Sequence, residues 1–319
     1  MSQDFPRVLI LAGGLSHERD VSLRSGRRTA EALREAGCEV DIADVDASLL
    51  STIEGHKPDV LWPLLHGATG EDGSVRDILE LTGIPYVGAK PGPSRLGWDK
   101  SVAKALLGNA GAHTPAHVAL PHNLFRELGA QNVLNTVNKR FNAPLFVKPV
   151  RGGSALGVSM VRDSSDLPRA MVQGFSYGEV ALIENAVIGT ELAVSVVDTG
   201  EGPQTLPAVE IVSNDGVYDY DARYNPGRVK YFAPARLDAK TAGKAAELAL
   251  LAHETLNLRH LSRTDMIIDH AGTPWFLEVN VAPGMTETSL LPQAAEAAGL
   301  PLGDLYRSII DAVIASHNN

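Results

Sequence analysis

Hydrophobic and polar positions along the first ninety residues predict strands and helices in alternation. The unbroken apolar run 7–12 has the length of a buried strand, and 22–36 carries apolar residues at helical spacing among arginines and glutamates. Such an alternation indicates a parallel sheet with helices packed on it. The other elements expected in this part are strands over 40–45, 60–65 and 86–87 and a helix over 73–81.

A different pattern follows Pro91-Gly-Pro93, whose turn chemistry predicts a domain boundary. Helices are expected over 99–110 and 124–140, and 145–147 is expected to pair with 158–161 as an antiparallel hairpin. The remaining expected elements are strands over 181–184, 191–197, 209–212 and 230–232 and helices over 239–256 and 302–315.

The most informative pattern is a second hairpin near the end of the chain. The runs 266–268 and 275–277 are typical of strands, and Asp269-His-Ala-Gly272 between them has the composition of a turn. Pairing symmetrically outward from that turn places Arg263 opposite Glu278. Side chains alternate between the two faces of a strand. Those expected on one face of this hairpin are Arg263, Asp265, Glu278 and Asn280.

This polar face predicts a site for a divalent metal. Two carboxylates and an amide oxygen beside a fixed guanidinium suit Mg²⁺, which prefers oxygen ligands and phosphate neighbours. The alternative is a cross-strand ion pair between Arg263 and Glu278 on a solvated face. Because that alternative leaves Asp265 and Asn280 unexplained, we favour the metal site.

A glycine-rich loop over 148–157 predicts a flap that contacts phosphate. It carries two cations and the hydroxyl of Ser154, and its glycines allow backbone N–H groups to approach a polyanion. The loop joins two strands and lacks the Gly-Lys-Ser/Thr sequence of a Walker motif, so an ordinary hairpin connection is the alternative. Gly13 and Gly14 lack the spacing of a dinucleotide-binding fingerprint, and NAD binding is therefore rejected.

Composition narrows the class of protein. A chain of 319 residues holds two or three domains, and 44% hydrophobic with 21% charged residues is typical of a globular protein. The formal net charge is -10 and no long run of lysine or arginine occurs, so no nucleic-acid partner is expected. The single cysteine, Cys38, fits a reducing compartment. With no apparent signal peptide or membrane-spanning apolar run, we expect a cytoplasmic protein without a membrane partner.

Four motifs together resemble the signatures of the D-alanine–D-alanine ligase family. They are Gly13-Gly-Leu-Ser-His-Glu18-Arg19-Asp-Val-Ser22-Leu-Arg-Ser25-Gly26, Leu65-His66-Gly67 with Gly70-Glu71-Asp72-Gly73, Tyr218-Asp-Tyr220-Asp-Ala-Arg-Tyr224, and Leu277-Glu278-Val-Asn280-Val-Ala-Pro283-Gly284-Met285-Thr286 with Ser289-Leu290. The resemblance covers almost the whole chain, and its last motif is the most specific.

The resemblance implies a fold of α/β and α+β class with the three-domain ATP-grasp architecture. A Rossmann-like N-terminal domain over 1–92 would hold the first substrate. A central ATP-grasp subdomain over 93–187 would carry the phosphate flap. A C-terminal ATP-grasp subdomain over 188–319 would carry the metal and second-substrate sites.

The resemblance also implies a reaction. ATP phosphorylates the carboxylate of a first D-alanine, and the amine of a second D-alanine attacks the acyl phosphate, giving D-alanyl-D-alanine for peptidoglycan precursor synthesis. The implied cofactors are ATP and two Mg²⁺ ions, with Mn²⁺ as an alternative metal. The implied partners are the small-molecule substrates and a second copy of the chain in a homodimer.

The family's functional residues match positions of this chain, residue by residue. The metal ligands are Asp265, Glu278 and Asn280, and the oxyanion donors are Arg263 and the Gly284 N–H. The family's contacts to the ATP phosphates match Lys100, Lys148, Ser154 and Arg223. Its contact to adenine matches Glu184, and its contact to ribose matches Glu191. Glu18 matches the anchor of the first ammonium, the Ser289 and Leu290 N–H groups bind the second carboxylate, and Glu18, Ser154 and Tyr224 form a trio that closes the site.

For five of these positions a plainer role is open. Tyr224 could simply pack on the surface, and Ser154 could hydrogen-bond to solvent. His66 is a substrate contact or a structural histidine. Glu18 and Ser289 could instead serve helix N-termini, where acidic and hydroxyl side chains are common.

The match departs from the family pattern at a few positions. These are Gly152, where an acidic residue is frequent, Ala155, which replaces a serine, Arg223 and Asn185, which replace lysines, and Val281-Ala282, which replace small hydroxyl residues. None removes a metal ligand. A ligase that uses D-lactate, D-serine or another acceptor, or one devoted to a natural-product dipeptide, stays open. The four converging polar groups disfavour a nucleotide-binding regulator without catalysis, and Glu18 and Ser289 disfavour a biotin-carboxylase-like enzyme.

Overall fold

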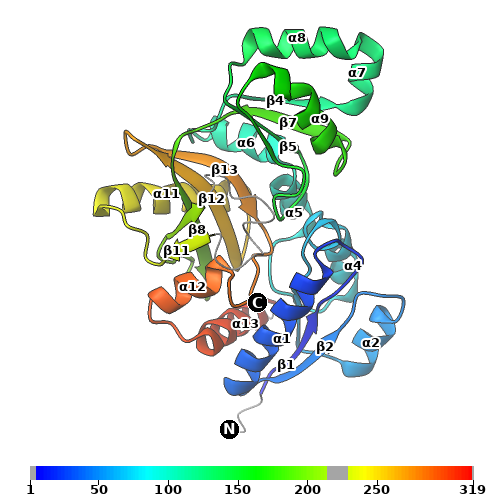
Figure 1. The fold of residues 1–319 in the computed structure, drawn as a ribbon. Helices are drawn as coiled ribbons and strands as arrows, with labels where there is room; N and C mark the ends of the chain where they lie inside the picture. The colour runs from blue at the N-terminus through cyan, green and yellow to red at the C-terminus, as the bar shows by residue number, and fades with distance from the viewer. Residues whose placement is uncertain (1–4, 214–228, 318–319) are drawn as a thin grey trace.

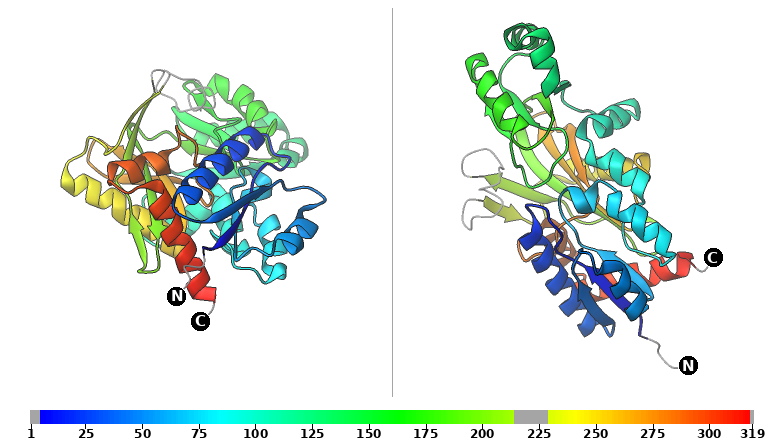
Figure 2. Two further views of the ribbon diagram at one scale, coloured as in Figure 1. Left: turned by 90° about the horizontal axis from the view of Figure 1, so that it is seen from below. Right: turned by 90° about the vertical axis from the view of Figure 1, so that its right-hand side faces the viewer.

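The structure is a computed structural model that describes residues 5–213 and 229–317. Its strands form three sheets with helices packed around them (Figure 1). The N-terminal sheet and helix α13 (Leu302–His317) lie at one end of an elongated molecule, and helices α7 (His122–Leu128) and α8 (Ala130–Arg140) lie at the other (Figure 2).

The N-terminal sheet is parallel, as the alternating pattern predicted. Its strands are β1 (Arg7–Leu11), β2 (Glu39–Ala43) and β3 (Val60–Pro63), in the order β2–β1–β3. The strand expected at 86–87 is only a single bridge between Leu61 and Tyr86. The helices of this part are α1 (Arg19–Glu35), α2 (Leu49–His56), α3 (Ala68–Glu71) and α4 (Ser74–Thr82).

The segment expected to form a turn between domains begins a helix instead. Pro91 stands in the first turn of α5 (Pro91–Trp98), where its missing N–H would have no partner within the helix in any case. Asp99 then caps α6 (Lys100–Asn109) by accepting hydrogen bonds from the next turn. The chain therefore leaves the first sheet through two consecutive helices.

The central sheet is antiparallel, in the order β4–β7–β5–β6. The predicted hairpin of β5 and β6 is confirmed, with the glycine-rich loop between its strands. Gly129, at positive φ, divides the expected helix 124–140 into α7 and α8. The bounds are β4 (His117–Pro121), β5 (Leu145–Pro149), β6 (Ser159–Val161), the 3₁₀ turn η1 (Ser164–Asp166), α9 (Leu167–Phe175) and β7 (Val180–Asn185).

The third sheet has six strands, with β11–β10–β8–β12–β13 in order and β9 paired to β8. Helices α11 and α12 belong to the same part of the chain, and α11 contacts β8 and β12. The bounds are β8 (Gly189–Asp198), β9 (Pro203–Thr205), β10 (Val209–Ser213), β11 (Val229–Phe232), α11 (Ala239–Thr255), β12 (Leu261–Asp269), β13 (Pro274–Asn280) and α12 (Leu290–Ala297).

The register of the β12–β13 hairpin differs from the symmetrical pairing expected. Ile268 pairs with Pro274, so the turn is one residue longer than expected, and a bulge between Asp265 and Met266 shifts the ladder by one more. Arg263 therefore lies opposite Asn280 and Asp265 lies opposite Glu278. The prediction that Arg263 opposes Glu278 was therefore wrong. The two pairs still share one face, because positions two residues apart on a strand point the same way.

One hydrophobic cluster joins the beginning of the chain to its end. Trp62 of β3 packs edge to face on Tyr306 of α13, with ring centroids 5.3 Å apart. Val8 and Ile10 belong to the same cluster as Leu290 and the buried face of α13. The central sheet has a cluster of its own with α8 and α9. Within the described ranges no helix is both long and apolar enough to cross a membrane.

Candidate active site

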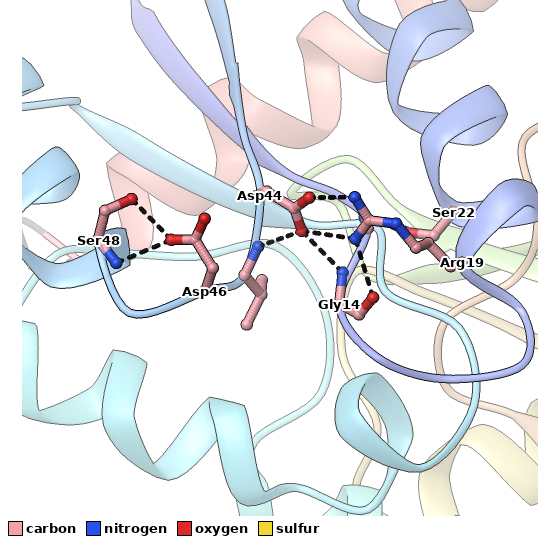
Figure 3. Close-up of polar contacts among 8 residues, drawn as sticks. Gly14, Arg19, Ser22, Asp44, Asp46 and Ser48 are labelled. Atoms are coloured by element: carbon pink, nitrogen blue, oxygen red, sulfur yellow. Dashed lines mark hydrogen bonds and ion pairs between the residues drawn. The ribbon is translucent and has the colours of Figure 1, made fainter.

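The loop between β1 and α1 is fixed at the carboxyl ends of the first strands (Figure 3). Asp44, directly after β2, accepts a hydrogen bond from the Gly14 N–H at 2.9 Å and another from Arg19 Nη1 at 3.0 Å. The bonds from Arg19 lower the pKa of Asp44 to about 2. On the other side, the Ser22 hydroxyl accepts from the Gly13 N–H at 2.8 Å. These contacts set where α1 begins.

Glu18, at the start of α1, does not serve the helix as a cap. It occupies the N-cap position, yet its side chain makes no capping hydrogen bond. The side chain is buried and faces the flap, because a β-carbon added to Gly153 would stand 2.7 Å from Glu18 Oε1. The plain helix-entry role is therefore not what the structure shows.

The polar face of the β12–β13 hairpin is a chain of charge pairs. Arg263 forms a buried, two-pronged pair with Asp265, with N–O distances of 2.7 and 2.8 Å. Asn280 Nδ2 lies 3.4 Å from Asp265 Oδ2. Glu278 pairs with Lys100 Nζ at 3.2 Å, and that ammonium also donates to the Gly152 carbonyl at 2.6 Å. The four predicted side chains thus lie together, and Lys100 links them to the flap.

Glu184 is buried between two lysines. Its Oε1 is 2.6 Å from Lys148 Nζ, and its Oε2 is 2.8 Å from Lys104 Nζ in an ion pair without hydrogen-bond alignment. Burial would raise the pKa of Glu184, but the two ammonium groups lower it to about 2. Burial lowers the pKa of Lys104 to about 8. Because both carboxylate oxygens already face lysines, a direct contact between Glu184 and adenine stays a prediction.

A cavity of about 220 Å³ opens between the central and third sheets. One part is apolar and another carries charged groups and the flap glycines, an arrangement that suits a ligand with a flat ring and an anionic tail. The apolar lining includes Phe146, Met160, Ile188, Ile267 and Leu277. The polar lining includes Lys100, Lys148, Glu184, Glu191, Asp265 and Glu278.

A smaller cavity of about 80 Å³ adjoins the first, and Gly153 lines both. It collects the predicted substrate residues and the hairpin face. Its polar lining includes Glu18, His66, Glu71, Ser154, Arg263, Asn280 and Ser289, with Gly284 and Leu290 beside them. Every predicted site residue that the structure describes therefore lines one of the two cavities, while Arg223 and Tyr224 lie outside the described residues.

The loop before α12 is closed by its own side chains. Ser289 Oγ accepts the Thr286 N–H at 2.9 Å and lies 2.9 Å from Thr286 Oγ1. It makes no capping bond to α12, so the simple helix-cap role is not seen. The Ser289 N–H itself donates to the Thr286 carbonyl at 3.1 Å, and the first turn of α12 begins at Leu290. The N-terminus of α12 opens into the smaller cavity.

Two buried titratable groups lie beside Glu18. Burial lowers the pKa of His66 to about 4, so its ring is neutral at physiological pH. Burial and the neighbouring charge of Glu18 raise the pKa of Glu71 to about 8, and Glu71 Oε1 accepts the Gly67 N–H at 2.9 Å. Glu71 therefore carries a proton at neutral pH.

Sequence reasoning missed several residues of this site. Lys104 was invisible because it stands on a helix surface whose burial only the packing reveals, although it follows Lys100 by one helical turn. Glu71 and Ser25 stand inside the quoted motifs without an assigned role, and Gly153 was treated only as part of a flexible loop.

The fold and the site define an ATP-grasp protein, in which two antiparallel sheets enclose a cavity with paired lysines and acidic residues. Family models described as the D-ala D-ala ligase C-terminus and N-terminus match residues 106–311 and 46–89. A D-alanine–D-alanine ligase of Magnetococcus marinus is 38% identical over 95% of this chain and 96% of its own length, and that of Bordetella petrii is 38% identical over 95% and 91%.

Solved structures agree with these sequence relatives. The D-alanine–D-alanine ligase of Bacillus anthracis has a TM-score of 0.84 at 29% identity, covering 98% of this chain and 99% of its own. A structure of that enzyme complexed with ATP has a TM-score of 0.81 at 27% identity, covering 98% and 99%. The VanG D-Ala:D-Ser ligase of Enterococcus faecalis has a TM-score of 0.81 at 26% identity, covering 97% and 100%. This chain belongs to the D-alanine–D-alanine ligase family.

Proposed function

We propose that the protein joins two molecules of D-alanine at the expense of ATP, giving D-alanyl-D-alanine, ADP and phosphate for peptidoglycan precursor synthesis. The observation that supports this most is the pair of adjoining cavities. One offers lysines and carboxylates to a nucleotide. The other offers the carboxylate of Glu18 to the ammonium of a first amino acid and the N-terminus of α12 to the carboxylate of a second. Family membership and the ATP-complexed neighbour point to the same reaction.

The first step transfers the γ-phosphoryl group to the carboxylate of the first D-alanine. We assign Glu18 to the ammonium of that substrate, which leaves its carboxylate directed towards Arg263. Lys100 and Lys148 place positive charge next to the phosphates, and the flap glycines bring backbone N–H groups over them. Enclosure by the flap keeps water from an acyl phosphate that would otherwise hydrolyse.

The second step forms the amide bond. The amine nitrogen of the second D-alanine attacks the acyl carbon, the amine loses a proton, and the C–O bond to phosphate breaks. Arg263 and the Gly284 N–H are placed to stabilise the negative charge on the carbonyl oxygen, and one such donor contributes about 3–4 kcal/mol in other enzymes. The second carboxylate is assigned to the Ser289–Leu290 turn at the N-terminus of α12.

The hairpin face fits Mg²⁺ by its donor chemistry. Among the described residues no three His, Cys, Asp or Glu side chains gather as a metal site. The proposed set needs only two carboxylates, Asp265 and Glu278, and the amide oxygen of Asn280, and both carboxylates already face cationic side chains. Bound there, Mg²⁺ supplies positive charge between the ATP phosphates and the attacking carboxylate.

Coupled measurement of ADP and of dipeptide product tests this proposal. With ATP, Mg²⁺ and D-alanine we expect both products in equal amounts, and with D-serine or D-lactate as the added acceptor we expect less mixed product than D-alanyl-D-alanine. A mixed product in excess would instead favour the acceptor preference named for the VanG neighbour. Light scattering tests the homodimer, for which we expect twice the chain mass of 33.9 kDa.

Glu278→Gln tests the metal assignment with little effect on folding. Its side chain is 19% exposed, whereas Asp265 is held in a buried ion pair whose loss would destabilise the fold. We expect kcat to fall by about a hundredfold or more, since the positive charge next to phosphate would be weakened. Glu296→Gln, on the exposed side of α12, is the control and should keep wild-type turnover. Equal kcat in both variants would contradict the assignment.

A further inference from the structure

Three segments far apart in the sequence meet behind the smaller cavity. The Met285 N–H donates to Ser25 Oγ at 3.1 Å, and Ser25 Oγ lies 3.0 Å from His66 Nε2. His66 and Ala282 both line this cavity. Helix α1 and the loop after β3 thus hold the segment that follows β13, and Arg28 adds a bond to the Thr286 carbonyl at 2.5 Å.

Ser25 Oγ is the centre of this set of bonds. A backbone N–H can only donate, so Ser25 Oγ accepts from Met285 and still has a proton and a lone pair with which to bond His66 Nε2. Ser25 Oγ thus joins the Met285 N–H to the His66 ring. Burial lowers the pKa of His66, so the ring in this set of bonds is neutral.

Two buried positions flank Gly284. Ala282 and Met285 stand on either side of Pro283-Gly284, and Met285 is fully buried. A β-carbon at Gly284 would lie 2.7 Å from Ser289 Oγ, so its backbone sits tightly against the loop assigned to the second substrate. Because Ser25 and Arg28 hold the residues directly after Gly284, and Ser289 packs against it, the direction of the Gly284 N–H is restricted.

We propose that Ser25 and His66 are positioning residues that hold the 282–285 segment, so that the Gly284 N–H points at the reacting carbonyl oxygen. His66 acts in this account through Ser25 and not as a substrate ligand. The inference rests on the proposed function, since it concerns the oxyanion donor of that reaction. It gives the N-terminal part of the chain a direct role in aligning the chemistry carried by the C-terminal part.

Ser25→Ala removes the central link while leaving the substrate-facing groups in place. We expect kcat to fall about tenfold to a hundredfold, the KM for ATP to stay within about twofold, and the KM for the second D-alanine to rise. We also expect faster hydrogen–deuterium exchange in the peptide 282–289 without any substrate. Thr29→Val is the matched control, because Thr29 is buried on the same helix and its hydroxyl has no partner among the described residues.

Variants at His66 distinguish a role in positioning the 282–285 segment from direct substrate binding. His66→Gln keeps one donor and one acceptor and should retain most of kcat with slow exchange over 282–289. His66→Leu keeps neither and should behave like Ser25→Ala. Above pH 5 the pH profile of kcat/KM should have the same shape in His66→Gln as in the wild type, because the ring does not titrate there.

The outcomes distinguish this inference from the proposed function. If the wild type makes dipeptide while Ser25→Ala matches Thr29→Val in both kcat and exchange, the positioning role is wrong. The role is also wrong if His66→Gln loses as much activity as His66→Leu while exchange over 282–289 stays slow, since that pattern indicates a direct ligand. If the wild type makes no dipeptide, the proposed function fails, and the exchange data alone decide whether Ser25 holds the segment. A Ser25→Ala protein that does not fold leaves His66→Leu to decide, with unchanged kcat and exchange counting against the role.

Discussion

Gly153 joins the two cavities because it has no side chain. Its φ is ordinary for an L residue, so alanine can adopt the backbone, but the added β-carbon would meet Glu18 Oε1 at 2.7 Å. Glu18 must then shift away from the position assigned to the substrate ammonium. The Glu18 carboxylate can therefore lie this close to the flap only because residue 153 has no side chain.

We expect Gly153→Ala to raise the KM for the first D-alanine by about tenfold or more, because a displaced anchor misplaces the reacting carboxylate. The KM for ATP should change less. Gly92→Ala in α5 is the control, since a β-carbon there has open space. Steady-state kinetics on both variants measure the difference, and an equal D-alanine KM in the two would count against the placement of Glu18.

The titration of Glu71 makes the free energy of unfolding depend on pH. Its pKa is raised to about 8 in the folded protein, above its ordinary value of 4.5, so the folded state holds the extra proton between these values. The favourable contribution is fully present below about pH 4.5 and is lost as pH rises towards 8, with a slope of up to about 1.4 kcal/mol per pH unit.

Glu71→Gln keeps the acceptor for the Gly67 N–H and removes the titration. We expect its free energy of unfolding to exceed that of the wild type at pH 8 and to differ little at pH 5. Urea denaturation at both values measures this. Parallel pH dependence in the two proteins would show that Glu71 is ionised throughout and that its burial is compensated.

The sequence indicated residue types at the site better than it indicated contacts. The types at Arg263, Asp265, Glu278 and Asn280 pointed to one polar face because strand periodicity is local. The bond between Ser25 and Met285 spans 260 residues and depends on packing that no local pattern encodes. The role of Tyr224 and Arg223 stays a prediction, since both lie outside the described residues.

At the scale of elements, α6 carries two lysines to different partners. Lys100 reaches the flap and Glu278, whereas Lys104, one turn later, is wholly buried against Glu184 and the Phe276 carbonyl. The ion pair at Glu184 holds Lys148 in the nucleotide cavity. Helix α6 therefore places one ammonium group against Glu184 of the central sheet and another against Glu278 of the third sheet.

Lys104→Met removes one of the two cations facing Glu184. We expect a loss of about 3–5 kcal/mol in the free energy of unfolding, because a buried carboxylate loses half of its compensation. The KM for ATP should rise, since Lys148 is less firmly placed. Lys139→Met, exposed on α8, should change stability by no more than about 0.5 kcal/mol. A small effect at Lys104 would mean that Lys148 alone compensates Glu184.

Local periodicity predicted most elements correctly, and the errors have physical causes. The predicted pairing of β12 with β13 missed two features. Ile268 pairs with Pro274, so the turn is one residue longer than expected, and a bulge follows Asp265. A turn was expected at Pro91-Gly-Pro93 because proline and glycine favour turns. Proline also suits the first turn of a helix, and α5 begins there.

At the scale of the whole molecule, the first and last parts of the chain share one core. The division into 1–92, 93–187 and 188–319 stays a proposal, and Trp62 and Tyr306 show that its first and third parts are packed together. The central sheet has a separate hydrophobic cluster.

Tyr306→Ala tests this shared core. We expect a loss of about 3–5 kcal/mol, because a large buried ring leaves a cavity. Hydrogen exchange should accelerate both in α13 and in β1, whereas the central sheet should change little. Tyr177→Ala, at a side chain 45% exposed, is the control. Faster exchange confined to α13 would show that the N-terminal sheet is stable on its own.

The most direct test of the central claim is the stoichiometry of a single incubation with ATP, Mg²⁺ and D-alanine. The account predicts one D-alanyl-D-alanine for each ADP and phosphate released, with no ADP formed when D-alanine is left out. ATP hydrolysis that is independent of D-alanine, or tight ATP binding without dipeptide, would contradict it.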